Sequence, residues 1–428
     1  MFDSRILELA TKVAGLDDDA HVDRIAALEE LKSACAAVQA TAALQLDTAR
    51  RVERAERGVP KRLQGRGIGT EVALARRESP NKGDRLLGFA RAMAEMPHTH
   101  ALLAAGKLNE WRATLLVQET ACLTKEDRAT VDEQLCADPT VLDGLGDRAV
   151  AAKAREHAAR LDVEALVRRG QRAVGDRHVS VRPAADSMVR LSALVPVVAG
   201  IGAYAALRRD ADALVGTGAA GERSRSQVMA DLLVERLTGT GTTAAQPVSV
   251  NVVISDEALF GDAEAPAHVD GYGDLPAAIA RTWISEAVEG DVAELRRVYA
   301  HPGSGALVNL ESVARCFPKG LARFINLRDK VCRTPWCDAP IRHSDHIEPV
   351  ENGGATTASN GAGLCEACNY AKQGLGWHTE PLPGLALHRI SVITPDGHTY
   401  LSTAPPLPRP ATTYARMVQA LRDVTRAA

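Results

Sequence analysis

Apolar residues in the first 240 positions recur with the spacing of helices. Between residues 23 and 57 they fall three or four positions apart, with one break at Gln45: Leu28, Leu31, Cys35, Val38, Ala42, Ala49 and Val52. This spacing predicts one long helix with a single buried stripe. A bundle helix is favoured over a dimerising coiled coil, because the stripe lacks persistent heptads with strong core residues. Shorter helices are predicted at 84–95, 101–106, 109–121, 124–136 and 147–170.

The spacing becomes strand-like after residue 177. Residues 178–182 and 187–194 alternate around a turn at 183–186, and 247–255 (PVSVNVVIS) is a third apolar run. We expect these three strands to form a small antiparallel sheet against the helices. A helix is predicted at 224–238, a strand at 388–393, a turn at 395–397 and a C-terminal helix at 412–426.

The 428 residues suffice for two or three domains. The predicted fold class is α+β. A mostly helical region (1–240) with a small antiparallel sheet is followed by a strand-containing connection (241–310). A compact domain (311–380) and a tail with a strand, a Pro-rich segment and a helix (381–428) complete the chain.

Charge and hydropathy exclude some classes of protein. The net charge of −3 argues against a strongly basic, histone-like binder. The most apolar stretch, 191–207, contains Pro196 and two glycines and is too short to span a membrane. Because no signal peptide is evident either, we expect a cytoplasmic protein that does not associate with membranes.

One basic segment stands out at residues 50–66. The segment contains seven basic residues and only two acidic ones, both glutamates. The basic residues are Arg50, Arg51, Arg54, Arg57, Lys61, Arg62 and Arg66. Such a cluster can contact DNA phosphates, which provide most sequence-independent affinity. A solvated helix end followed by a loop explains the same residues, so both interpretations stay open.

Four of the eight cysteines form two tight pairs. Cys332 and Cys337 are followed, after 27 residues, by Cys365 and Cys368. Two short knuckles of this kind can present four thiolates to one tetrahedral Zn²⁺. In a cytosolic chain, paired cysteines favour a metal over a disulfide, with buried free thiols or a redox pair as alternatives. A zinc ion with four sulfur ligands has no open position, so its role is expected to be structural.

Polar residues between and beyond the cysteine pairs suggest chemistry. Residues 342–347 are predicted to form a short strand, 351–354 a hairpin-type turn, and Asn369 to begin a helix. An acid, an imidazole and an amide in one concavity can bind a hard divalent cation and activate a water. Asp345 and His346 are adjacent, however, and would point to opposite faces of a regular strand. They converge only if the strand ends or bends there.

The arrangement C-x4-C…D-H-I-x-P…G-G…N…L-C-x2-C-N-x2-K over residues 329–378 resembles the HNH nuclease motif. That resemblance implies a ββα-metal fold held by structural zinc. It implies that His346 is the general base and that Asp345 and Asn369 bind a catalytic Mg²⁺ or Mn²⁺. It further implies that Asn360 orients the imidazole and that Lys372 lies near the scissile phosphate. The third motif position is often histidine, so Asn369 implies a weaker metal ligand.

Less specific motifs elsewhere resemble actinobacterial proteins in which a domain of unknown function 222 precedes an HNH nuclease, the 13E12-repeat type. They are Met96-Pro97, Ala105-Gly106, Leu108, PVSVNVVIS, Asp270-Gly271-Tyr272-Gly273 and Thr394-Pro395-Asp396-Gly397. The predicted function is metal-dependent hydrolysis of DNA phosphodiester bonds. DNA is the expected partner, and cutting of both strands by one site per chain would suit a homodimer. The alternatives are a zinc-stabilised DNA-binding or regulatory protein with little or no nuclease activity, and a structural zinc ribbon in which His346 is an ordinary surface residue.

Overall fold

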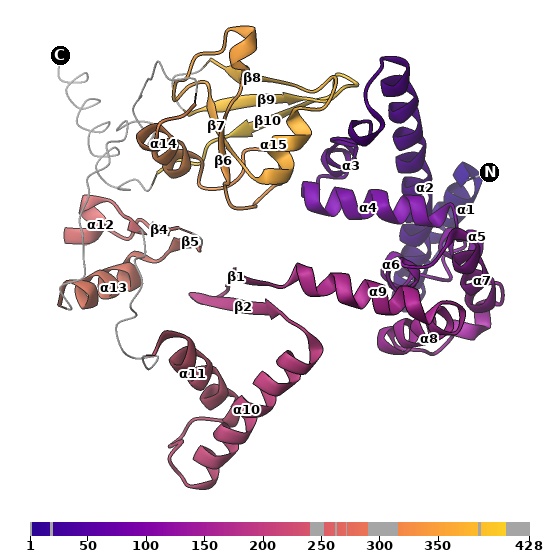
Figure 1. The fold of residues 1–428 in the computed structure, drawn as a ribbon, viewed down its shortest axis with the longest axis horizontal. Coiled ribbons are helices and arrows are strands. Elements are labelled where there is room, and N and C mark those ends of the chain that lie inside the picture. Colours follow the sequence, from indigo (N-terminus) through magenta and orange to yellow (C-terminus); the bar gives the residue numbers. More distant parts are fainter. Residues whose placement is uncertain are drawn as a thin grey trace.

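The computed structural model describes residues 2–17, 20–239, 252–261, 263–270, 272–289, 316–383 and 387–407. The fold is α+β, as predicted: helices dominate the N-terminal half, and the described strands form small antiparallel sheets (Figure 1). None of the helices in these ranges is long and apolar enough to cross a membrane.

The N-terminal region is a helical bundle. Its helices are α1 (Phe2–Ala14), α2 (His21–Glu56), α3 (Ile68–Arg76), α4 (Pro80–Met93), α5 (Pro97–Ala104), α6 (Glu110–Thr120), α7 (Lys125–Cys136), α8 (Asp147–Leu161) and α9 (Val163–Ala173). The shared core is rich in alanine, with Leu103, Leu116 and Leu135 among its larger members. The helix predicted at 147–170 is two helices, because the Asp162 side chain accepts the Ala165 amide and starts α9.

The long predicted helix is confirmed as α2, but its predicted buried stripe is wrong. Leu28 and Val52 are 46% and 53% exposed. The buried face instead carries small residues and, near the end of the helix, polar ones: Ala27, Ser33, Ala34, Ala36, Ala37, Ala40, Ala43, Asp47, Arg50 and Arg54. Small side chains allow close packing of the neighbouring helices, and Asp47 is neutralised by Arg91 of α4. Tertiary packing therefore overrides the hydrophobic pattern here.

The middle of the chain forms two smaller units. The predicted hairpin is confirmed as β1 (His178–Ala184) and β2 (Met188–Leu194), followed by α10 (Val197–Gly216) and α11 (Arg225–Thr238). The second unit contains β3 (Val252–Val253), α12 (Asp256–Phe260), β4 (Ala267–Val269), β5 (Gly273–Leu275) and α13 (Ala277–Glu289). The prediction that the third apolar run joins the hairpin in one sheet is wrong, because β3 pairs with β4. Residues 247–251 of that run, and the helix predicted at 412–426, lie outside the described residues.

The C-terminal domain contains the predicted ββα unit. It comprises α14 (Lys319–Asp329), β6 (His343–His346), the turn η4 (Val350–Asn352), β7 (Gly361–Leu364) and α15 (Glu366–Lys372). A second sheet follows, made of β8 (His378–Leu382), β9 (Arg389–Ile393) and β10 (Thr399–Thr403) in the order β10-β9-β8. Ile390 and Val392 of β9 pack against Ile347 and Ala362 of the ββα unit. The strand predicted at 388–393 is confirmed as β9, and through it the folded residues continue past residue 380.

Helix α3 joins the helical bundle to this C-terminal domain. Leu74 is buried in the same cluster as Ile347, Ala362, Ile390 and Val392. Helices α3 and α4 lie against α15 in the structure (Figure 1). The two regions thus share part of one hydrophobic core.

Candidate functional site

The four paired cysteines lie together, as predicted. All four sulfurs are buried and lie within 4.8 Å of one another. The Cys337 sulfur is 3.8 Å from that of Cys365 and 3.7 Å from that of Cys368. A tetrahedron with Zn–S bonds of about 2.3 Å has sulfurs about 3.8 Å apart, whereas a disulfide needs about 2.05 Å. The geometry is therefore compatible with a four-cysteine zinc site and not with disulfides.

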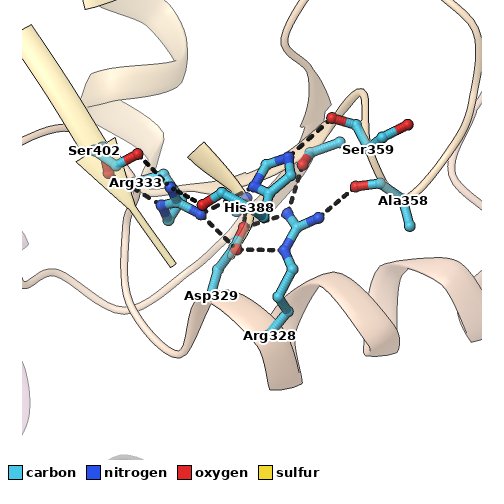
Figure 2. A network of polar contacts seen from close by, with 9 residues as sticks. Arg328, Asp329, Arg333, Ala358, Ser359, His388 and Ser402 are labelled. Carbon is cyan, nitrogen blue, oxygen red and sulfur yellow. Dashed lines mark hydrogen bonds and ion pairs between the residues drawn. The ribbon is translucent and has the colours of Figure 1, made fainter. Parts of the chain in front are cut away.

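A buried ion network holds the first knuckle against the rest of the domain (Figure 2). Asp329, at the end of α14, is fully buried and accepts hydrogen bonds from Arg328, Arg333 and the Gly363 amide. Arg328 also donates to carbonyl oxygens of Ala358 and Gly361. The network therefore links α14 to the loop before β7 and to β7 itself.

The same network reaches the second sheet. Arg333, next to Cys332, donates to the Ser402 hydroxyl and carbonyl and to Nδ1 of His388. Nε2 of His388 donates in turn to the Ser359 carbonyl. Burial, aided by the nearby arginines, lowers the pKa of His388 to about 4, so the ring is neutral near pH 7. Sequence reasoning missed these residues, because nothing in their spacing distinguishes them from surface charges.

Asp345 and Lys372 meet across the ββα unit. The Lys372 ammonium lies 2.7 Å from Oδ2 of Asp345 and also donates to the carbonyl oxygen of His346. Asn369 stands one turn before Lys372 on α15, so its side chain shares that face of the helix. Its amide oxygen is buried and accepts no hydrogen bond from the residues that the structure describes. An acidic oxygen and an unpaired amide oxygen therefore occupy the facing elements.

His346 has different partners from its neighbour. It is the last residue of β6, is 9% exposed, and its ring lies 4.4 Å from that of Phe317 at an angle of 42°. Its Nε2 is 2.9 Å from the Thr356 hydroxyl. Burial lowers the pKa of the imidazole, against an opposing effect of the Asp345 charge. The structure thus places His346 with Phe317 and Thr356, and Asp345 with Lys372.

The side chain of Asn360 is bonded to backbone groups of the loop between β6 and β7, and its expected role in orienting the imidazole stays a prediction. Its amide nitrogen donates to the carbonyl oxygens of Glu348 and Ala355, and its amide oxygen accepts the Glu348 amide. The side chain therefore braces the loop between β6 and β7 and does not bond to the imidazole. Its influence on His346 is indirect, through the loop that carries Thr356. Thr356 itself was missed, although it lies in a polar run, Thr356-Thr357-Ala358-Ser359-Asn360, that marks a structured loop.

Two residues of the basic segment are buried rather than available to DNA. Arg50 is 8% exposed and pairs with Glu71 at 3.0 Å and with Asp396 at 2.5 Å. Arg54 is 2% exposed and donates to the carbonyl oxygens of Gln64 and Arg66. These side chains cannot reach a phosphate in this conformation, which corrects the expectation for both.

The other five basic residues keep at least part of their surface. Arg57, Lys61 and Arg62 are exposed, and Arg51 and Arg66 are half-buried. Arg51 and Arg57 bind Asp47 and Glu53 on their own helix. A DNA contact by these five residues stays a prediction.

Comparisons with known proteins cover most of the chain. A family model described as a domain of unknown function (DUF222) matches residues 25–329, and one described as an HNH endonuclease matches residues 331–374. An uncharacterized protein of Mycobacterium tuberculosis is 33% identical over 136 residues, which is 31% of this chain and 23% of that protein. The match thus covers less than a quarter of that relative's length. No solved structure matches.

Proposed function

The chain belongs to the DUF222 family and carries an HNH endonuclease domain, and from this premise we propose that it is a metal-dependent endonuclease that hydrolyses phosphodiester bonds of DNA. The observation that supports the proposal is the presence of three polar groups on β6 and α15, two elements that contact each other. They are the Asp345 carboxylate, the unpaired amide oxygen of Asn369, and a neutral, buried imidazole at His346.

The donor set fits a hard divalent cation. Carboxylate and amide oxygens are ligands that Mg²⁺ and Mn²⁺ prefer. A buried amide oxygen without a hydrogen bond is costly unless something else satisfies it, and Asn369 carries such an oxygen. Asp345 and Asn369 would hold the ion. When bound, it would stabilise the negative charge that develops on the phosphate and on the leaving 3′ oxygen.

His346 is assigned the role of general base. Its lowered pKa keeps the ring unprotonated near pH 7, which a base requires. The contact with Phe317 and the bond from Nε2 to Thr356 fix the ring plane. With Nε2 donating to the Thr356 hydroxyl, Nδ1 is the nitrogen that takes a proton from the attacking water. Asn360 maintains this arrangement by bracing the loop on which Thr356 lies.

Cleavage of supercoiled plasmid DNA by the purified full-length protein tests the proposal. We expect nicking with Mg²⁺ or Mn²⁺ and none with a chelator. His346→Ala should reduce the rate by about 10²–10⁴-fold, the usual contribution of a general base. His378→Ala, which removes an exposed histidine at the start of β8, is the matched control and should leave the rate unchanged.

Two results would contradict the proposal. Nicking by His346→Ala at the wild-type rate would show that His346 is not the general base. Binding of DNA without any metal-dependent cleavage would instead favour a zinc-stabilised DNA-binding protein.

A further inference from the structure

The Lys372 side chain is largely buried, and its ammonium is bound by two acceptors. Lys372 lines a small cavity of about 30 Å³ between α3 and the C-terminal core, together with Thr70, Ala371 and Trp377. Its ammonium donates to Asp345 Oδ2 at 2.7 Å and to the His346 carbonyl oxygen. The side chain is only 14% exposed. The ammonium is therefore a fixed positive charge and not a mobile surface group.

This position conflicts with the cation site of the proposed function. Asp345 is one of the two residues assigned to hold the divalent ion, and a Mg²⁺–oxygen bond is about 2.0–2.1 Å long. An ammonium and a divalent ion on the same carboxylate would be close neighbours in a partly buried site. Their repulsion is poorly screened there. Each cation therefore lowers the affinity of Asp345 for the other.

We propose that Lys372 is a built-in competitor of the divalent cation for Asp345. The inference rests on the proposed function and adds a regulatory role for this lysine to it. Without the divalent ion, the ammonium neutralises Asp345 and keeps the site assembled. Binding of the ion displaces the ammonium from Asp345 and frees N–H groups that can meet a phosphate oxygen, since an ammonium has three donors. By reciprocity, the lysine weakens cation binding by the same factor as the cation weakens its ion pair.

Titration of zinc-loaded, full-length protein with Mn²⁺ tests this inference, with free Mn²⁺ measured by electron paramagnetic resonance. Zinc loading keeps the four cysteines from binding Mn²⁺. Lys372→Met should bind Mn²⁺ about five- to tenfold more tightly, as expected when one partly buried ion pair no longer has to be broken. Lys372→Gln should also bind more tightly. The control Lys319→Met removes an exposed lysine at the start of α14 and should bind as the wild type does.

Asp345→Ala separates the possible failures. If the wild type binds Mn²⁺, Asp345→Ala does not, and both Lys372 variants bind no more tightly than wild type, the competition is refuted while the proposed function stands. If the wild type and Asp345→Ala both fail to bind, the cation site is absent, and the proposed function fails together with the inference. In support, Mn²⁺ should increase labelling of Lys372 by an amine-reactive reagent in the wild type. Unchanged labelling at saturating Mn²⁺ would overturn the inference.

Discussion

Replacing Asp329 by asparagine is expected to destabilise the C-terminal domain strongly. The carboxylate is fully buried and faces the guanidinium groups of Arg328 and Arg333 (Figure 2). Asparagine has nearly the same shape but no charge, so it leaves two buried arginines without their counter-ion. Breaking a buried pair by removing one partner costs about 3–5 kcal/mol. This range includes the cost of leaving the Gly363 amide without its acceptor.

The electrostatics of Asp329 support this magnitude. Burial alone would raise the pKa of its carboxyl, but the hydrogen bond and charge of Arg328 and the charge of Arg333 outweigh burial and hold the pKa below its usual value. A lowered pKa in the folded state means that the carboxylate stabilises the fold at neutral pH. That contribution is lost only as the pH falls through the folded-state pKa. The full cost of the substitution should therefore be visible near pH 7.

Hydrogen–deuterium exchange of the amides in β7 measures the effect locally, which matters because a chain of this size need not unfold in two states. A loss of about 3–5 kcal/mol corresponds to exchange about two to four orders of magnitude faster. Asp338→Asn, which neutralises an exposed acid in the first knuckle, is the control and should change exchange little. Less than a tenfold increase in Asp329→Asn would refute the view that this network carries much of the domain's stability.

Two further predictions concern contacts around the site. Leu74→Ala should cost about 2–5 kcal/mol, because Leu74 is 1% exposed in the core shared by α3 and the C-terminal domain. An unchanged thermal unfolding midpoint would contradict that shared core. His388→Gln should flatten the loss of stability at mildly acid pH. The folded pKa of about 4 lies below the ordinary 6.5, so protonation of the unfolded chain costs the wild type stability as the pH falls below about 6.5. By pH 5 the wild type should have lost about 2 kcal/mol of unfolding free energy that His388→Gln keeps. Denaturant unfolding at several pH values measures this loss, and equal pH profiles for the two proteins would show that the ring does not stay neutral.

The sequence predicts the ββα unit well because its signals are local. Knuckle cysteines, an alternating strand and a helix start lie within one short segment, and each has its own spacing rule. The four sulfurs consequently meet as expected, and α15 presents Asn369 and Lys372 on one face. The spacing of residues along the sequence is less informative about contacts between side chains that are distant in the chain. It did not reveal that the amide of Asn360 is fully used by backbone groups, or that Thr356 holds His346.

In the helical region the sequence predicts the element but not its contacts. The existence of α2 is predicted from periodicity, but its buried face is not. The reason lies in partners distant in sequence: Asp47 faces Arg91, and Arg50 faces Glu71 and Asp396. Buried ion pairs of this kind invert the usual assignment of charged residues to the surface. No pattern within residues 23–57 encodes where those partners lie.

The DUF222 region also contributes to the structure of the C-terminal domain. Helix α3 of this region contributes to the hydrophobic core that it shares with the C-terminal domain. Gly67, just before α3, has a positive φ of 79°. It also lies so close to Trp377 that a Cβ at this position would be 2.6 Å from the indole nitrogen. Glycine alone satisfies both demands without strain. With Arg50 held by Asp396 on the far side of the boundary, a fragment without the helical region would expose Ile347, which directly follows the proposed base. Loss of activity in such a fragment would therefore report a disrupted core, and evidence for DNA binding by the helical region has to come from its exposed basic residues in the intact chain.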